Sequence, residues 1–227
     1  MRQREWERAA EAYAAALELG AQVFQAAGSD AVRRREVRES WHVHARASYA
    51  LLRRGQLADA LVTLDRGKAR LLGERLGLAP ETGLDTERIL ALAPAGGALV
   101  MPVVTPAGGA ALVFPAGRRT PAPEDVLWLD GLTDLAVVEL LGGPTDAPLG
   151  AWLGGFMAER GALLGSPGRL AWEEAIATAI GKLWKLVMGA VHERLRRLGL
   201  ARGAPVAIVP QGGLSLLPLA AAGAFPR

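Results

Sequence analysis

The chain of 227 residues has no cysteine and only three histidines. Without cysteine, this sequence contains no disulfide, no thiolate metal site and no cysteine nucleophile. Three histidines leave little for a histidine-rich metal site. We therefore expect no metal and no cofactor, and we assign no catalytic residue within this sequence.

Long apolar runs are also lacking. Charged residues interrupt the N-terminus from Arg2 onward, which excludes the apolar core of a signal peptide. No uninterrupted apolar stretch reaches the roughly 18 residues that a transmembrane helix needs. The longest apolar stretch, residues 212–226, is broken by Pro218. We expect a cytoplasmic protein that does not contact a membrane.

The chain has little net charge, but its charged residues are unevenly distributed along the sequence. The net charge of +3 is too small to imply nucleic-acid binding, and hydrophobic residues at 51% predict a packed core. Residues 1–79 carry a net charge of +4, residues 80–168 of −6 and residues 169–227 of +5. Arg outnumbers Lys by 23 to 3, which we attribute to the codon usage of a GC-rich bacterial genome.

The first third of the chain predicts helices over residues 3–27, 31–54 and 57–76, because it is rich in helix-forming residues and is broken by glycine. A repeat is visible at an offset of 35, where Trp6 and Gly20 recur as Trp41 and Gly55. This period is close to that of tetratricopeptide units. The first copy is degraded, and one long helix through Gly20 is the alternative.

After residue 80 the apolar residues come in short runs. Residues 98–104 and 110–114 predict a β-hairpin with a loop of about five residues, and Pro102 argues for an edge position or a bulge. Residues 126–129 predict a third strand. A short helix over 132–141, starting near Thr133 or Asp134, a helix over 151–163 and a turn at 166–168 follow. We also assign the glycine pairs, such as Gly154-Gly155, to turns.

The strongest helical pattern covers residues 169–198, and residues 205–209 form an apolar strand. This strand is apolar on both faces, which predicts a central position between two covering layers. The helix covers one face with Trp184, Val187 and Val191, and no later segment is left for the other face. We expect an α+β or α/β fold: tetratricopeptide-like helical hairpins over residues 1–79, then an α/β domain over residues 80–227.

Two motifs resemble one family. The sequence PQGGLSLLPLAA at residues 210–221 resembles the Pro-x-Gly-x-Leu-x-x-Leu-Pro signature that follows the first core strand of CHAT domains, which are caspase-like and associated with tetratricopeptide repeats. The sequence LDRGKARLL at residues 64–72 resembles the helix that precedes such domains. The resemblance covers nearly the whole chain in the right order. It implies part of a caspase-like α/β domain over residues 80–227.

The resemblance also implies a Cys–His dyad on later strands. His42, His44 and His192 lie upstream and do not match the catalytic position, so the chain resembles either the N-terminal part of such a peptidase or a degenerate member. It implies a protein partner or a protein substrate, no nucleic acid, and helical repeats that sense or recruit the partner. The apolar C-terminal segment is a candidate for self-association. Residues 200–227 are expected to be mobile or self-associating, whereas the helices over residues 31–76 are expected to stay ordered.

A non-enzymatic adaptor is the alternative function, in which the helices of residues 31–76 bind a protein segment. The other candidate motifs favour ordinary structure. His42 and His44 stand two residues apart on a helix and cannot share one ion. The arginines at 33–35 and 38 are diluted by acidic neighbours, and Ser215 lies outside any Gly-x-Ser-x-Gly motif.

Overall fold

The protein has a mixed fold in which helices pack around one four-stranded sheet. The computed structural model describes residues 3–76, 84–143, 151–160 and 167–222. The helices are α1 (Gln3–Ala26), α2 (Asp30–Arg53), α3 (Leu57–Leu76), α4 (Thr86–Leu90), α5 (Asp134–Gly142), α6 (Trp152–Glu159), α7 (Pro167–Leu183) and α8 (Gly189–Arg197). The strands are β1 (Ala98–Thr105), β2 (Gly108–Pro115), β3 (Val126–Leu129) and β4 (Val206–Ile208). Within the described ranges, no helix is both long and apolar enough to cross a membrane.

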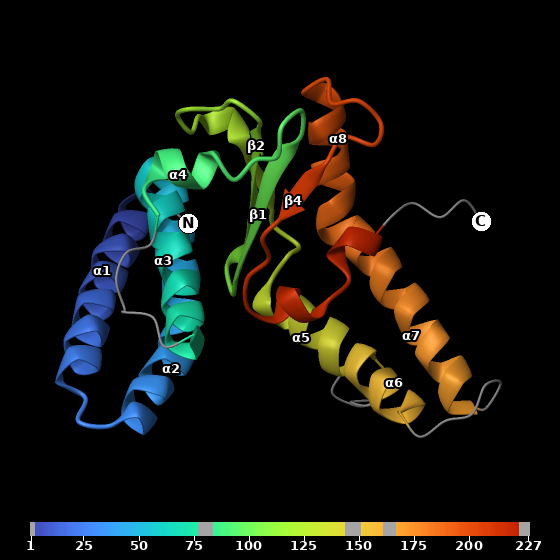
Figure 1. Cartoon of the computed structure of the whole chain (residues 1–227), viewed down its shortest axis with the longest axis horizontal. Coiled ribbons are helices and arrows are strands. Elements are labelled where there is room, and N and C mark those ends of the chain that lie inside the picture. The colour runs from blue at the N-terminus through green and yellow to red at the C-terminus, as the bar shows by residue number, and fades with distance from the viewer. Residues whose placement is uncertain (1–2, 77–83, 144–150, 161–166, 223–227) are drawn as a thin grey trace.

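The three N-terminal helices form an antiparallel array along one side of the sheet (Figure 1). Their expected ranges are confirmed, and α1 runs unbroken through Gly20. Gly55, with a φ of 77°, makes the turn between α2 and α3. Small residues allow α2 and α3 to approach closely: a Cβ on Gly67 would lie 2.6 Å from the Cβ of His44.

The β1–β2 hairpin is confirmed, but its connection is shorter than expected. Thr105 pairs with Gly108, so only two residues form the turn instead of five. The Oγ1 of Thr105 donates to the Gly108 carbonyl oxygen at 2.8 Å and accepts from the Ala107 N–H at 3.2 Å. These two side-chain hydrogen bonds hold the two-residue turn in place, and the apolar pattern of the sequence does not predict them.

The strand order is β3-β2-β1-β4, with β1 antiparallel to β2 and parallel to β4. β1 is therefore an interior strand up to Val100, whereas Pro102 has a strand partner, among the described residues, on the β2 side only, so the expected edge position holds at Pro102 but not for the strand as a whole. The Ala98 N–H donates to the Pro205 carbonyl oxygen, and the Val100 carbonyl oxygen accepts from the Val209 N–H. The N–H and C=O groups of even-numbered β1 residues therefore point toward β4. The pairing with β4 ends at Val100. Pro102 lies just beyond it, where its missing N–H breaks no ladder bond.

β4 is the last strand in the sheet order, not a central one, so that prediction was wrong. It pairs with β1 over three residues, all half-buried, and no strand of the described chain lies on its other side. The sheet itself is covered on both faces, which corrects the expectation of one bare face. Figure 1 shows α2 and α3 on one side and α8 on the other.

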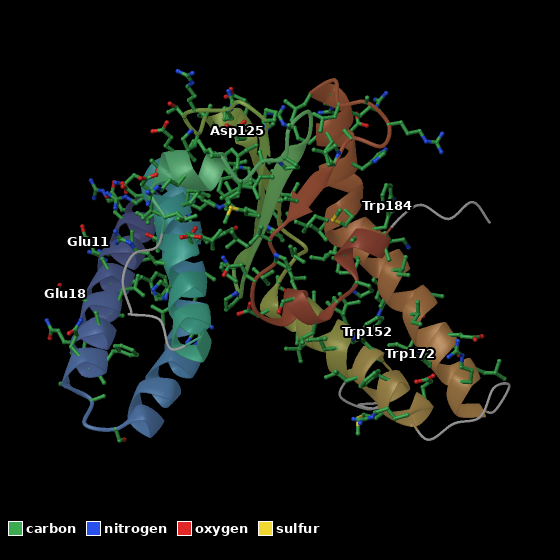
Figure 2. The ribbon with its side chains drawn as sticks, in the orientation of Figure 1. Glu11, Glu18, Asp125, Trp152, Trp172 and Trp184 are labelled. Carbon is green, nitrogen blue, oxygen red and sulfur yellow. The ribbon has the colours of Figure 1, made fainter. Side chains whose placement is uncertain are left out.

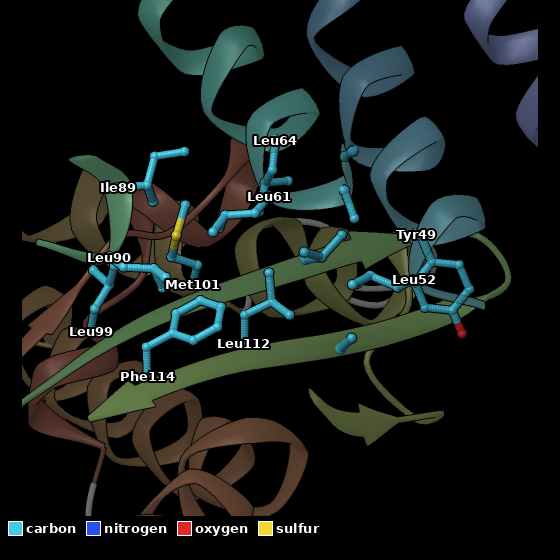
Figure 3. Packing of buried hydrophobic residues seen from close by; sticks show 14 residues of the cluster. Tyr49, Leu52, Leu61, Leu64, Ile89, Leu90, Leu99, Met101, Leu112 and Phe114 are labelled. Carbon is cyan, nitrogen blue, oxygen red and sulfur yellow. The ribbon is translucent and has the colours of Figure 1, made fainter. Parts of the chain in front are cut away.

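The face toward the N-terminal helices holds the first hydrophobic cluster. Figure 3 shows Leu61 and Leu64 of α3 above Met101, Leu112 and Phe114 of the strands. All five side chains are at most 1% exposed. The buried members are Ala45, Tyr49, Leu52, Ala60, Leu61, Leu64, Ile89, Leu90, Leu99, Met101, Val103, Ala110, Leu112 and Phe114. Helices expected in one domain and strands expected in the next thus share one core.

The second cluster covers the opposite face. Its strand residues Val100, Ala111 and Val113 pack against the long C-terminal helix and against the segment that follows β4. The buried members are Val100, Ala111, Val113, Leu129, Leu132, Val137, Leu140, Leu183, Val187, Val191, Leu214, Leu217, Leu219 and Ala222. The apolar stretch after residue 212 is thus packed as far as Ala222, where the description ends.

The long C-terminal helix is interrupted rather than uniform. A π-helical turn, η2 (Trp184–Met188), joins α7 to α8, and the Gly189 N–H donates to the Trp184 carbonyl oxygen five residues earlier. Val187 and Val191 are buried as expected, but Trp184 lies outside the core clusters and is only partly buried. Pro167 begins α7 as its first residue, so the turn expected at 166–168 was wrong for Pro167 and Gly168.

α6 and α7 pack through aromatic residues. Trp152 and Trp172 lie with ring centroids 4.7 Å apart (Figure 2). Gly155 lies inside α6, where a Cβ would meet that of Ala175 at 2.8 Å. The expected turn at Gly154-Gly155 was therefore wrong, because the second glycine serves a close contact between helices. α6 ends at Glu159, and the rest of the expected helix falls at Arg160 and on residues outside the description.

Candidate functional site

The two motifs that resemble the CHAT family meet in the structure. Gln211 is 6% exposed, and its Nε2 donates to the Leu64 carbonyl oxygen at 3.4 Å. These residues are 147 positions apart in the chain. The contact joins the segment after β4 to α3, across the end of the sheet. This hydrogen bond ties the loop after β4 to α3.

The glycines of the second motif have separate structural reasons. Gly212 has a φ of 49°, in the left-handed region that glycine tolerates best. Gly213 has no room for a side chain, since a Cβ would lie 2.9 Å from the Cγ1 of Val137 and 3.1 Å from the Cδ1 of Leu141. The turn η3 (Gly212–Leu216) therefore packs directly on α5, and Leu214 fills the second cluster.

The first motif is anchored at three points. Leu64 is fully buried against the sheet. Asp65 accepts a hydrogen bond from the Leu84 N–H at 2.7 Å, which ties α3 to the segment leading into α4. Gly67 lies against His44, as described above. The side chains of residues 68–72 lie outside the described part of the chain.

A cavity of about 350 Å³ opens beside this contact, at the carboxyl end of β1. It lies between α2, α5 and the loop after β4. Its lining residues are His42, Arg46, Val104, Asp134, Val137, Val138, Leu141, Gln211, Gly213 and Leu214. Ligand sites of α/β proteins form at the carboxyl ends of parallel strands, where neighbouring connections run to opposite faces of the sheet. β1 and β4 are parallel and the cavity lies beside their carboxyl ends, but β1 continues into β2 through a hairpin, so only the position next to the strand ends is shared with such sites.

The polar side chains of the cavity come from α2, from α5 and, through Gln211, from the loop after β4. The Nη2 of Arg46 lies 3.6 Å from the Oδ2 of Asp134, an ion pair beyond hydrogen-bond length. The Nε of Arg46 is buried and has no hydrogen-bond partner among the described residues. Thr133 caps α5 by accepting from the Ala136 N–H at 3.1 Å. The cavity is thus mostly apolar, with His42, Arg46, Asp134 and Gln211 as its polar side chains and one incompletely bonded guanidinium among them.

No family model, no curated protein and no solved structure matches this chain.

The histidines considered from the sequence are separated by the fold. His42 lines the cavity, whereas His44 is buried against Gly67 of α3. His192 is exposed and its ring centroid lies 5.5 Å from that of Trp184. In the described part of the chain, no three histidine or acidic residues are grouped to hold a metal ion.

The remaining candidates do not form a site. Ser215 is exposed, and its Oγ donates to the Gly212 carbonyl oxygen at 2.6 Å, as in an ordinary turn. The side chains of the arginines at 33–35 and 38 fall outside the description. Sequence reasoning did not single out Arg46, Asp134 or Gln211, although Gln211 falls within the recognised motif.

A second polar cluster supports β3 at the far edge of the sheet. Asp125, labelled in Figure 2, is fully buried and accepts from the Arg118 Nε at 3.1 Å and from the Ala122 N–H at 2.8 Å. This hydrogen bond from Arg118 raises the pKa of its guanidinium. Arg194 of α8 lies 3.9 Å from the same carboxylate. We assign this cluster to structure, because every carboxylate oxygen has a partner.

Proposed function

We propose that this chain is the N-terminal part of a CHAT-type caspase-like cysteine peptidase. The helices α1 to α3 serve partner sensing or recruitment, and the sheet forms one side of a peptidase domain whose Cys and His come from outside this sequence. The observation that carries the proposal is the β4 edge. It is parallel to β1, and no strand of the described chain lies beyond it.

The geometry of β4 suits a further strand. Pro205 accepts from β1 and Val209 donates to β1, so odd-numbered residues direct their backbone groups toward β1. Val206 and Ile208 therefore direct their N–H and C=O groups away from the sheet. These groups offer the pairing that an additional parallel strand requires.

The contact between Gln211 and Leu64 also supports the proposal. The two motifs were singled out independently along the sequence, and each has a defined structural reason for its small residues. A chance likeness in composition gives no reason for them to touch.

The adaptor alternative receives less support. It needs a free face on α2 and α3, but Tyr49, Leu52, Leu61 and Leu64 are buried in the cluster with β1 and β2. That face is occupied and cannot bind a peptide. Recruitment of a partner would use other surface, such as α1, where Leu19 and Val23 are 61% and 43% exposed.

The direct test is expression of this sequence with the segment encoded immediately after residue 227. We expect that segment to supply a His and a Cys after apolar strands, and the longer protein to cleave protein substrates. Its Cys→Ala variant should be inactive. Absence of the Cys–His pair, or activity that survives the Cys→Ala change, would overturn the proposal.

Hydrogen exchange offers a matched test inside β4. In the chain alone, the amides of Ala207 and Val209 face β1 and should exchange slowly, while those of Val206 and Ile208 should exchange fast. In the longer protein all four should be slow. Slow exchange of all four in a monomer of this chain alone would show that β4 needs no further strand.

A further inference from the structure

We propose that the cavity at the carboxyl end of β1 binds an aliphatic carboxylate, with Arg46 as the residue that recognises its charge. This inference concerns a ligand site and does not rest on the proposed peptidase. It follows from the cavity's size, its apolar lining and the unused donors of one arginine.

The size and lining define the body of the ligand. About 350 Å³ lies at the lower end of the range for small-molecule sites. Val104, Val137, Leu141 and Leu214 supply the walls, and none of them offers a polar side-chain atom. A short branched aliphatic group fills such a space. Only His42, Arg46, Asp134 and Gln211 offer polar side chains, so a sugar or a nucleotide would leave most of its hydroxyl groups unpaired there.

The incomplete hydrogen bonding of the Arg46 guanidinium indicates the charged group of the ligand. Guanidinium groups hold carboxylates best through two parallel N–H bonds. Asp134 instead meets a single nitrogen of Arg46 at 3.6 Å, and the Nε has no partner among the described residues. A carboxylate inside the cavity can accept both N–H groups after a rotation of the guanidinium. Asp134 is held at the start of α5 and does not reach them in this structure.

The same geometry makes Asp134 compete with the ligand carboxylate for Arg46. It is about as exposed as Arg46, with side-chain exposures of 38% and 34%, so the existing ion pair is weak. A bound carboxylate displaces it and is also repelled by it. Removing the Asp134 charge should therefore tighten binding, whereas removing the Arg46 charge should weaken it. These opposite signs cannot both result from a loss of folding.

The test is a titration of the chain with 4-methylpentanoate, followed by amide NMR shifts of the cavity residues. A second arm uses N-acetyl-glycyl-leucine, because a peptide C-terminus offers the same carboxylate and branched chain. The neutral controls are 4-methylpentanamide and the leucine amide of the peptide. We expect at least one of the two acids to bind at least about tenfold more tightly than its own amide.

The variants separate charge recognition from apolar binding. Arg46→Gln should lower the affinity for the acid about tenfold or more, and Asp134→Asn should raise it about threefold or more. Arg88→Gln, an exposed arginine on α4, serves as the control and should bind like the unmodified chain. Binding by the peptide acid alone would identify a peptide C-terminus as the source, and binding by the free acid alone a small metabolite.

Two results would overturn the proposal. Equal binding of acid and amide would show that the cavity accepts any hydrophobic group. No shift with either acid at 10 mM, a concentration about tenfold above a 1 mM dissociation constant, would show that it is closed to such ligands.

Discussion

At the β3 edge of the sheet, the guanidinium of Arg53 lies 3.8 Å from the ring centre of Trp128, whereas the β4 edge presents only Val206, Ala207 and Ile208. The β3 edge carries a cation, and a buried ion pair of Asp125 lies directly before the strand. Charges and bulky side chains are the usual means of blocking unwanted pairing at a sheet edge. β4 has no charged residue of its own. The difference indicates that β3 ends the sheet, whereas β4 can pair with a further strand. We call these two edges the β3 boundary and the β4 junction.

The largest expected effect is at the β3 boundary. Arg118→Ala removes the main charged partner of fully buried Asp125 and leaves the carboxylate with the Ala122 N–H at 2.8 Å and Arg194 at 3.9 Å. Breaking a buried pair in this way costs about 3–5 kcal/mol, and we expect the lower end because Arg194 remains. Urea unfolding would measure it. Arg119→Ala, an exposed neighbour, should change the free energy of unfolding by less than about 0.5 kcal/mol.

Two matched valines compare an interior strand with the β4 edge. Val113 of β2 is fully buried, while Val206 of β4 is only partly buried at the rim of the same cluster. Val113→Ala should cost about 2–3 kcal/mol and Val206→Ala about 1 kcal/mol. Equal costs would mean that β4 is already packed like an interior strand, which would contradict the junction interpretation. In the longer protein the cost at Val206 should rise.

A smaller effect is expected from replacing Arg53, whose guanidinium covers the ring of Trp128. Arg53 donates from Nη2 to the Tyr49 hydroxyl at 2.6 Å and lies over Trp128 in a cation–π contact. Arg53→Gln should lower the free energy of unfolding by about 1–2 kcal/mol and increase acrylamide quenching of the part of the tryptophan fluorescence that is lost in Trp128→Phe. The adjacent Arg54→Gln is the control. If both variants behave alike, the cation does not protect this edge.

The smallest effect concerns the pH dependence of the same boundary. A hydrogen bond from its own backbone N–H, and then the bond from Arg118, lower the pKa of Glu124 below its ordinary value. A lowered carboxyl pKa gives stability that is present above the ordinary pKa and is lost as pH falls through the lowered one. Carboxyl-carbon NMR would measure the pKa. Arg118→Gln should bring it part of the way back, because the backbone bond remains.

Local pattern was enough to predict most elements. The three N-terminal helices, the hairpin, β3 and α5 follow from apolar spacing and from breakers such as Gly55. Three of the assignments that needed correction share a cause: Pro102, Pro167 and Gly155 were assigned from residue preference alone. Their actual roles depend on where a neighbouring strand stops, where a helix begins and how closely another helix approaches.

The candidate site was less predictable. Motif resemblance marked Gln211 and Leu64 separately, but their contact depends on the packing of α3 against the end of the sheet. Arg46 and Asp134 belong to no recognised motif. Their pairing depends on a cavity that forms only when α2, α5 and the loop after β4 come together. Such a tertiary arrangement leaves no periodic signal in the sequence.

Pro102 stands where the parallel ladder between β1 and β4 ends. Ala98 donates to the carbonyl of residue 205, so by the same step of two the next donors would be residues 100 and 102, facing residues 207 and 209. Proline has no N–H, so the ladder cannot advance past that point. The chain after β4 leaves the ladder there and turns through Gly212 toward α5. The residue without an N–H thus stands opposite the point where the segment that lines the cavity begins.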